Sequence, residues 1–160
     1  MVAVAAATED IKYKIDMYGK WFECKVSLTR TLDDGLQKQV KEIYIVDALS
    51  FTEAETRILE ELKVYVDVLL ISIKYCEANE IIDSHNPLDG VWYKAKVAML
   101  SIDESAGKEK KVNVTLYVRA KDFRSALANT EAFLGGLVMD STILSIAETN
   151  IMEVFEYKAS

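Results

Sequence analysis

Apolar and polar residues alternate over residues 22–28, with the period of a strand that has one buried face. Asp33-Asp34-Gly35 follows and favours a hairpin turn in which glycine adopts a positive φ. A return strand is predicted over residues 40–46. The start of this pattern therefore predicts a β-hairpin.

The apolar period then lengthens to that of a helix. Ser50 and Glu53 have the spacing of a capping box, in which each side chain bonds the other residue's backbone N–H. We predict a helix over residues 51–63 whose apolar stripe packs on the sheet. A third strand is predicted over residues 67–82, long enough to bend. The stripe consists of Phe51, Ala54, Ile58 and Leu62.

The chain also resembles itself at an offset of 71 to 73 residues. The second copy predicts a hairpin with a loop at residues 105–107 and a helix that is capped by Asp122. That helix is expected to end at Gly135-Gly136 in the left-handed conformation, before a final strand over residues 142–157. The matching residues include Trp21-Phe22 with Trp92-Tyr93, Lys25-Val26 with Lys96-Val97, and Phe51 and Ala54 with Phe123 and Ala126.

These elements predict an α+β fold made by tandem duplication of a ββαβ unit. We expect antiparallel sheets with two helices packed on one face. Residues 1–20 form an N-terminal extension in this interpretation, and residues 21–160 form a single domain. The repeats cover residues 21–82 and 91–157, and a turn-rich connector covers residues 83–90.

Composition agrees with one folded domain. The 160 residues are 51% hydrophobic, and the formal net charge is −7. No apolar run approaches the roughly 20 residues of a membrane helix, and the N-terminus lacks a basic stretch before an apolar one, so we expect a cytoplasmic protein. Cys24 and Cys76 lie in apolar alternating segments, which predicts two buried, reduced thiols.

Three strings of residues suggest a family. W-F-E-C-K-V near the start, V-D-A-L-S-F-T-E-A-E before the first helix and A-E-T-N-I-M-E-V-F-E-Y at the end resemble an uncharacterised domain family of Bacteroidetes and their phages. The resemblance spans about residues 21–157 and implies a cytoplasmic bacterial or phage protein. It implies no catalytic activity. The predicted topology is also similar, more weakly, to coactivator-type and whirly single-stranded-DNA-binding domains, although the strand order differs.

Catalytic and metal-binding patterns are sparse. The single histidine, His85, lies in the connector beside Asp83 and Asp89, where such residues usually bond the turn itself. A zinc or calcium site needs more converging ligands than these. The chain contains no nucleophile elbow, phosphate-binding glycine loop or zinc-protease motif. We therefore expect a protein that is not an enzyme and that needs no cofactor or metal.

The outward faces of the predicted strands are more informative. Residues 91–124 carry eight basic and four acidic side chains, although the whole chain is acidic. Aromatic rings stack on exposed bases and cations contact phosphates, so this face predicts binding of single-stranded DNA or RNA, as in a replication or recombination accessory protein. The predicted nucleic-acid-binding residues are Trp21, Lys25, Trp92, Lys94, Lys96, Lys111, Tyr117, Arg119 and Lys121.

Two alternatives remain open at this stage. Trp21 and Trp92 are equally interpretable as core anchors, with the lysines guarding sheet edges against aggregation. The chain is also interpretable as a protein-interaction or homo-oligomeric phage-assembly module that binds no nucleic acid. In that case, the long strands over residues 67–82 and 142–157 would pair between chains.

Overall fold

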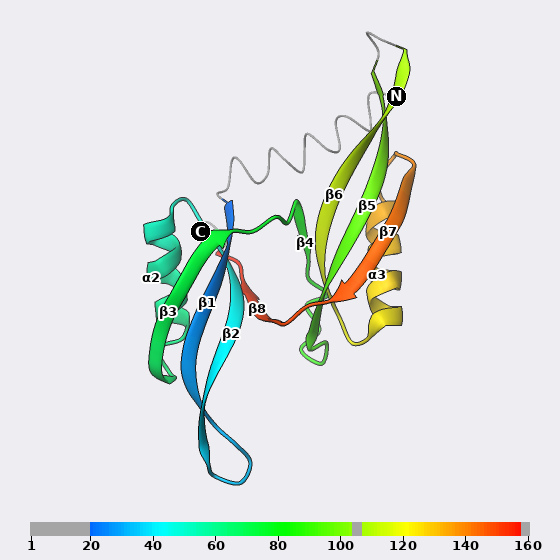
Figure 1. The fold of residues 1–160 in the computed structure, drawn as a ribbon. Coiled ribbons are helices and arrows are strands. Elements are labelled where there is room, and N and C mark those ends of the chain that lie inside the picture. Colours follow the sequence, from blue (N-terminus) through cyan, green and yellow to red (C-terminus); the bar gives the residue numbers. More distant parts are fainter. Residues whose placement is uncertain (1–19, 104–106, 158–160) are drawn as a thin grey trace. The chain divides into compact units, whose positions relative to one another are not determined.

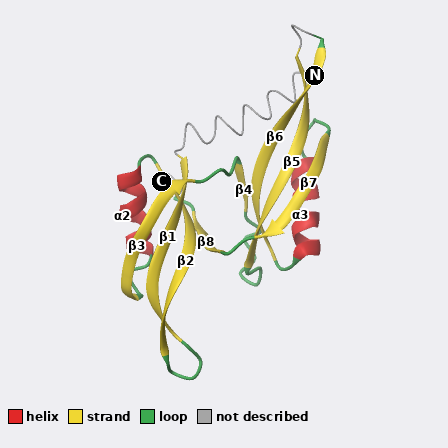
Figure 2. Cartoon of the chain, viewed as in Figure 1, coloured by secondary structure: helices red, strands yellow, loops and turns green. Residues whose placement is uncertain are grey.

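The computed structural model describes residues 20–103 and 107–157, which form eight strands and two helices (Figures 1 and 2). The fold class is α+β, as predicted. The strands form two four-stranded sheets, and the described chain divides into two compact units. The first unit contains residues 20–76 and 150–157, and the second contains residues 77–149. Residues 1–19 of the predicted extension and 104–106 of the second hairpin loop lie outside the described residues.

The first unit has the sheet order β3-β1-β2-β8. Strands β1 and β2 form the predicted hairpin, and Gly35 in its turn has a φ of +83°. Helix α2 follows β2 and covers one face of the sheet (Figure 1). The elements are β1 (Lys20–Thr31), β2 (Gln37–Ala48), α2 (Phe51–Glu61), β3 (Val66–Tyr75) and β8 (Ile151–Phe155).

The second unit has the corresponding order β7-β5-β6-β4, and helix α3 lies on one face of its sheet (Figure 2). Strands β5 and β6 form a hairpin, and β7 pairs with β5 in the antiparallel direction. The elements are β4 (Glu80–Ile82), β5 (Val91–Asp103), β6 (Lys108–Ala120), α3 (Phe123–Gly135) and β7 (Ser141–Glu148).

The third strand of each predicted repeat is not continuous, which corrects the sequence-based expectation. The segment predicted over 67–82 divides into β3, in the first unit, and β4, which pairs with β6 in the second. Likewise, the segment over 142–157 divides into β7 and β8, and β8 pairs with β2 of the first unit. Both short strands pair in the parallel direction. Each unit thus receives its fourth strand from a segment that begins in the other unit's sheet.

Polar residues account for the two breaks. Asn79 donates its backbone N–H to the carbonyl of Thr115, and its side-chain oxygen accepts the N–H of Thr115, which starts β4 on a new neighbour. Thr149 donates both its N–H and its hydroxyl to the carbonyl of Trp92, which ends the β7 ladder. These bonds join each residue to a strand that is distant in the sequence, at the point where the chain changes its neighbouring strand.

The N-caps of both helices agree with the predictions from the sequence, whereas the C-terminal end of α3 does not. Ser50 accepts the N–H of Glu53 at 3.1 Å, and Asp122 accepts the N–H of Ser125 at 2.8 Å, so both predicted N-caps are confirmed. Gly136, however, has a φ of −80°. The prediction of a left-handed glycine at the end of α3 is wrong, because the cap N–H bonds the carbonyls of Phe133 and Leu134 in an ordinary right-handed turn.

Each unit has its own apolar core between sheet and helix. In the first unit, the inward residues of β1 and β2 pack against Ala54 and Ile58 of α2 and against Leu62, the C-cap of that helix. In the second, Ala95, Val97 and Met99 of β5 pack with β6 and with Leu134 of α3. The predicted alternation of residues 22–28 is therefore confirmed by the burial of Phe22, Cys24, Val26 and Leu28.

Candidate functional site

The predicted aromatic residues do not form an exposed platform. Trp92 and Tyr117 lie on neighbouring strands, on the face opposite the helix, but their exposed fractions are only 3% and 4%. Trp21 is half-buried. Alternation predicts the sheet face of these rings correctly, but it does not predict what covers that face. The expectation that Trp92 and Tyr117 are exposed is wrong. The alternative of core tryptophans fits Trp92 better.

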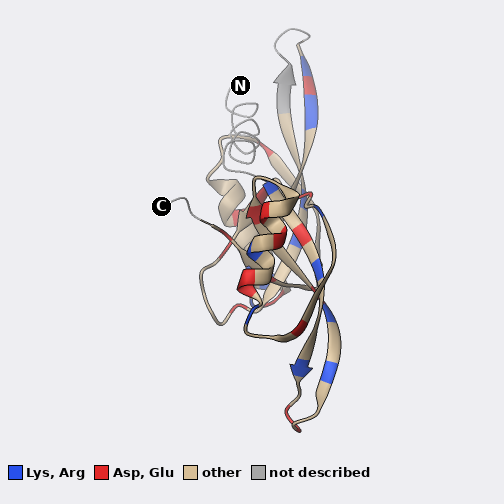
Figure 3. Ribbon diagram, turned by 90° about the vertical axis from the view of Figure 1, so that its left-hand side faces the viewer, with Lys and Arg blue, Asp and Glu red and all other residues tan. Residues whose placement is uncertain are grey.

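Two of the predicted cations are engaged within the fold. Lys94 forms an ion pair with Glu77. Arg119 donates from Nε to the carbonyl of Asp89 at 2.7 Å and lies 3.4 Å from a carboxylate oxygen of Asp83. The other four predicted cations have exposed side chains, and the β5–β6 hairpin carries further exposed lysines near its tip (Figure 3). The four are Lys25, Lys96, Lys111 and Lys121.

The connector forms turns. Asp83 accepts the backbone N–H of His85 at 2.8 Å, and Asn86 accepts that of Leu88 at 3.0 Å. His85 itself has a φ of +56°. Among the described residues, no group of three histidine, cysteine or acidic side chains is placed to hold a metal ion. These contacts agree with the interpretation that the connector's polar residues bond the turn.

The outer strand of the first unit exposes apolar side chains that alternation alone did not single out. Within the described residues, β3 has a neighbouring strand on one side only. Val66, Leu69 and Ile71 are 58%, 63% and 43% exposed, although they belong to a strand. A strand edge with these properties offers unpaired backbone groups and an apolar surface to a partner.

A β-bulge in β3 determines which of its side chains share a face. Leu69 pairs with Ser27 and Ser72 pairs with Lys25, so Leu69 and Ser72 lie on the same face although they are three residues apart. The extra residue is Ile71. The second unit has the same irregularity in β7, where Leu144 is the extra residue and is 57% exposed. Both units thus expose an apolar bulge residue on an outer strand.

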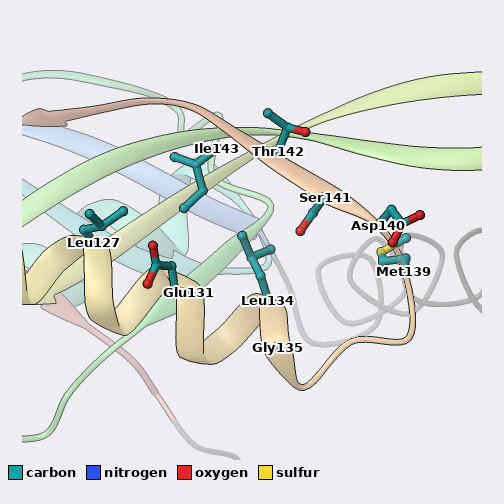
Figure 4. Close-up of a pocket in the computed structure, with 9 residues that line it drawn as sticks. All are labelled: Leu127, Glu131, Leu134, Gly135, Met139, Asp140, Ser141, Thr142 and Ile143. Carbon is teal, nitrogen blue, oxygen red and sulfur yellow. The ribbon is translucent and has the colours of Figure 1, made fainter.

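A groove lies between α3 and β7 in the second unit. It has a volume of about 600 Å³. Leu127, Glu131 and Leu134 line it from the helix, and Ile143 lines it from the strand (Figure 4). The remaining lining residues are Gly135, Met139, Asp140, Ser141 and Thr142.

A comparison with protein-family models identifies the family of the chain. The model described as a domain of unknown function, DUF4494, matches residues 20–157. The chain belongs to the DUF4494 family. Searches of curated proteins and of solved structures found no match. None of the helices in the described part of this DUF4494 chain has the length and apolar character to cross a membrane.

A partly buried polar cluster lies beside the first core of the DUF4494 domain, to which Tyr44 belongs. Arg30 donates to both carboxylate oxygens of Glu42, at 2.7 and 2.9 Å, and Tyr44 donates its hydroxyl to Glu42 at 2.5 Å. The hydrogen bond from Arg30 holds the pKa of Glu42 below its ordinary value, and burial raises the pKa of Tyr44. The guanidinium of Arg30 also lies over the Tyr65 ring, 4.7 Å from its centroid.

A second polar cluster attaches the C-terminal strand of the DUF4494 domain. Tyr157 donates its backbone N–H to Asp47 at 2.8 Å and its hydroxyl to Glu61 at 2.8 Å. Arg57 lies over the Tyr157 ring at 4.2 Å and donates to the carbonyl of Asp47 at 2.5 Å. Burial raises the pKa of Asp47, and burial together with the bond to Glu61 raises the pKa of Tyr157 to about 12. The cluster joins β8 to α2 and β2.

Neither cysteine forms a disulfide bond in the described part of the chain, and only one of the two is buried. Cys24 is fully buried, and this burial, with the nearby charge of Glu23, raises the pKa of its thiol to about 12. Cys76 is half-buried, where β3 ends. The expectation of two buried thiols is therefore corrected for Cys76.

Proposed function

We propose that this DUF4494 chain is a non-catalytic protein-interaction module that forms a symmetric homodimer through β3. The observation that carries the proposal is the outer edge of β3, where Val66, Leu69 and Ile71 are exposed on a strand with one described neighbour. Pairing of two such edges would bury these side chains and satisfy the outward backbone groups of both strands.

The sequence of β3 is complementary to itself in the antiparallel direction. If Leu70 of one copy faces Ile71 of the other, Asp67 faces Lys74 and Leu69 faces Ser72 at both ends of the pairing. A twofold axis requires this reciprocity, because residue i contacts j wherever j contacts i. The bulge supports the same register, since it puts Leu69 and Ser72 on one face of the strand. The charges of Asp67 and Lys74 have opposite signs at the two ends. Because β3 is irregular again between Val66 and Leu69, where Asp67 has a φ of +56°, and because Lys74 also pairs with Glu23 of its own chain at 2.9 Å, the contacts of Leu69 with Ser72 determine the register.

The bulge and the end charges also limit the assembly. An edge of ten residues buries less than a standard interface, so we expect a dissociation constant on the order of micromolar. Bulges and charged residues prevent a strand edge from extending into an open aggregate. The expected species is a closed dimer.

Substitutions at Leu69 and Ser72 test whether two copies of β3 pair in this register. Sedimentation velocity of the full chain over a range of concentrations should show a monomer–dimer equilibrium, which Leu69→Lys weakens by at least about tenfold because two lysines enter an apolar edge. In Leu69→Lys/Ser72→Glu, each introduced lysine faces an introduced glutamate, so dimerisation should recover. Val138→Lys, which changes an 83% exposed residue outside β3, is the matched control. A wild-type chain that stays monomeric at all concentrations contradicts the proposal.

Binding of single-stranded nucleic acid is the second candidate, supported by the exposed lysines of the second unit. Lys96 and Lys111 lie on the outward face of neighbouring strands, and residues 91–124 are basic in an otherwise acidic chain. With Trp92 and Tyr117 buried, such binding would depend on phosphate contacts more than on stacking.

A labelled oligonucleotide titrated at two salt concentrations separates the two candidates. Phosphate contacts predict binding that weakens steeply with salt and is lost in Lys96→Glu/Lys111→Glu. Lys38→Glu/Lys41→Glu, a pair of exposed lysines on β2, is the control for net charge. Equal loss in both variants, or no binding at low salt, removes this candidate and leaves the dimer proposal untouched.

A cytoplasmic location, in a bacterium or a phage-infected cell, is part of the proposal. The two cysteines support it, because cysteines without a disulfide bond are typical of reducing compartments.

A further inference from the structure

We infer that the groove between α3 and β7 binds an extended segment of a partner protein, with apolar and basic side chains alternating on its groove-facing side. The inference concerns a different surface and a different partner from the β3 dimer, and it does not depend on dimerisation. It deepens the general proposal that the chain is a protein-interaction module.

The first feature of the site is the outer backbone edge of β7. Among the described residues, β7 pairs with β5 and is the outermost strand of its sheet. An extended peptide can therefore add to β7 as a further strand. The helix beside it then forms the opposite wall, which is the arrangement in which edge strands recognise peptides with sequence preference. Side chains at alternate positions of the added strand would enter the groove.

The second feature of the site is the lining of the groove, which is apolar and acidic. Leu127, Leu134 and Ile143 form its apolar surface, and Glu131 projects between them from the helix (Figure 4). Asp140 lies at one end. None of the nine lining residues is basic, and within the described residues the carboxylates of Glu131 and Asp140 form no ion pair and accept no hydrogen bond. The groove is thus acidic at two places along an apolar floor, which complements a segment that alternates valine-like and arginine-like side chains.

The third feature of the site is Gly135, which lines the groove and has no side chain to fill it. A Cβ built on Gly135 meets no atom within 4 Å, and the residue does not have a positive φ. A large side chain at this position is therefore compatible with the helix backbone, and because Gly135 itself lines the groove, we expect the side chain to narrow it. Gly135→Phe is a direct steric test of the site.

The probe is a fluorescein-labelled peptide, Thr-Val-Thr-Arg-Thr-Val-Thr-Arg-Thr with blocked ends, measured by fluorescence polarisation with the full chain. We expect saturable binding that is lost when both arginines are replaced by glutamate. Glu131→Lys should weaken binding by at least about fivefold, because it replaces attraction with repulsion at the groove. Gly135→Phe should abolish it.

The controls separate this site from general charge attraction. Glu55→Lys changes the net charge by the same amount at an exposed position of α2 in the other unit, and it should bind the peptide as the wild type does. Circular dichroism melts establish that each variant is folded. The inference is overturned if the wild type does not bind, if Glu55→Lys weakens binding as much as Glu131→Lys, or if Gly135→Phe binds normally. Peptide binding that is intact in Leu69→Lys distinguishes this result from failure of the β3 dimer.

Discussion

Cys24 and Cys76 show how strongly position determines the chemistry of one residue type. Burial raises the pKa of Cys24 to about 12, so at pH 8 its thiol is almost entirely protonated and unreactive. Cys76 is half-buried at the end of β3. A thiol reagent such as iodoacetamide should therefore modify Cys76 first and reach Cys24 only on unfolding. Mass spectrometry of the time course measures this order, and modification of both residues at one rate would contradict the burial of Cys24.

Glu42 is the second residue whose environment makes a prediction. Glu42→Gln removes the charge that accepts two hydrogen bonds from Arg30, so the free energy of unfolding at pH 7 should fall by about 1–3 kcal/mol. Because folding lowers the pKa of Glu42 from its ordinary 4.5, this stability is present above that value and disappears as the pH falls.

Urea denaturation from pH 7 to pH 3 measures the effect. The difference between wild type and Glu42→Gln should shrink below about pH 4. A difference that stays constant over this range would mean that the charge of Glu42 does not stabilise the fold.

Among the elements, β8 is held in the first unit by a short parallel ladder with β2 and by the polar cluster that follows it. It pairs with β2 at only four positions, and the cluster of Arg57, Asp47 and Tyr157 fixes the residues that follow it. Arg57→Ala removes the cation over the Tyr157 ring and one partner of Asp47. We expect faster amide hydrogen exchange in residues 151–157 with little change in β1. Uniformly faster exchange would show that Arg57 stabilises the whole unit instead.

The helices and hairpins were predictable because their signals are local. Ser50, Asp122 and Gly35 act on neighbours within three residues, and each has the predicted role. The breaks after β3 and β7 were not predictable in the same way, since Asn79 and Thr149 act through bonds to Thr115 and Trp92, far along the chain. Periodicity reports one continuous run of strand-forming residues and does not report a change of neighbouring strand.

The candidate site was predictable only in part for a similar reason. Alternation assigned the sheet faces of Trp92 and Tyr117 correctly but carried no information about what covers a face, and both are buried. The bulge at Ile71 reverses the alternation within β3, and no residue in that strand signals it. The exposed edge therefore required the sheet order as well as the sequence.

At the scale of the whole chain, the proposals concern association rather than catalysis. The first unit offers β3 as a self-complementary edge, and the second offers a groove beside β7. The family, DUF4494, covers both units in its match to residues 20–157, so both surfaces lie within the part of the chain that defines the family.

The most direct test of the central claim is sedimentation velocity of wild type, Leu69→Lys and Leu69→Lys/Ser72→Glu at matched concentrations. We expect a concentration-dependent dimer for the wild type, a monomer for the single variant and a restored dimer for the double variant. The double variant should recover because its lysine and glutamate face each other only in the antiparallel register centred between Leu70 and Ile71. A wild type that remains monomeric, or a double variant that stays as monomeric as Leu69→Lys, would contradict pairing through β3 in this register.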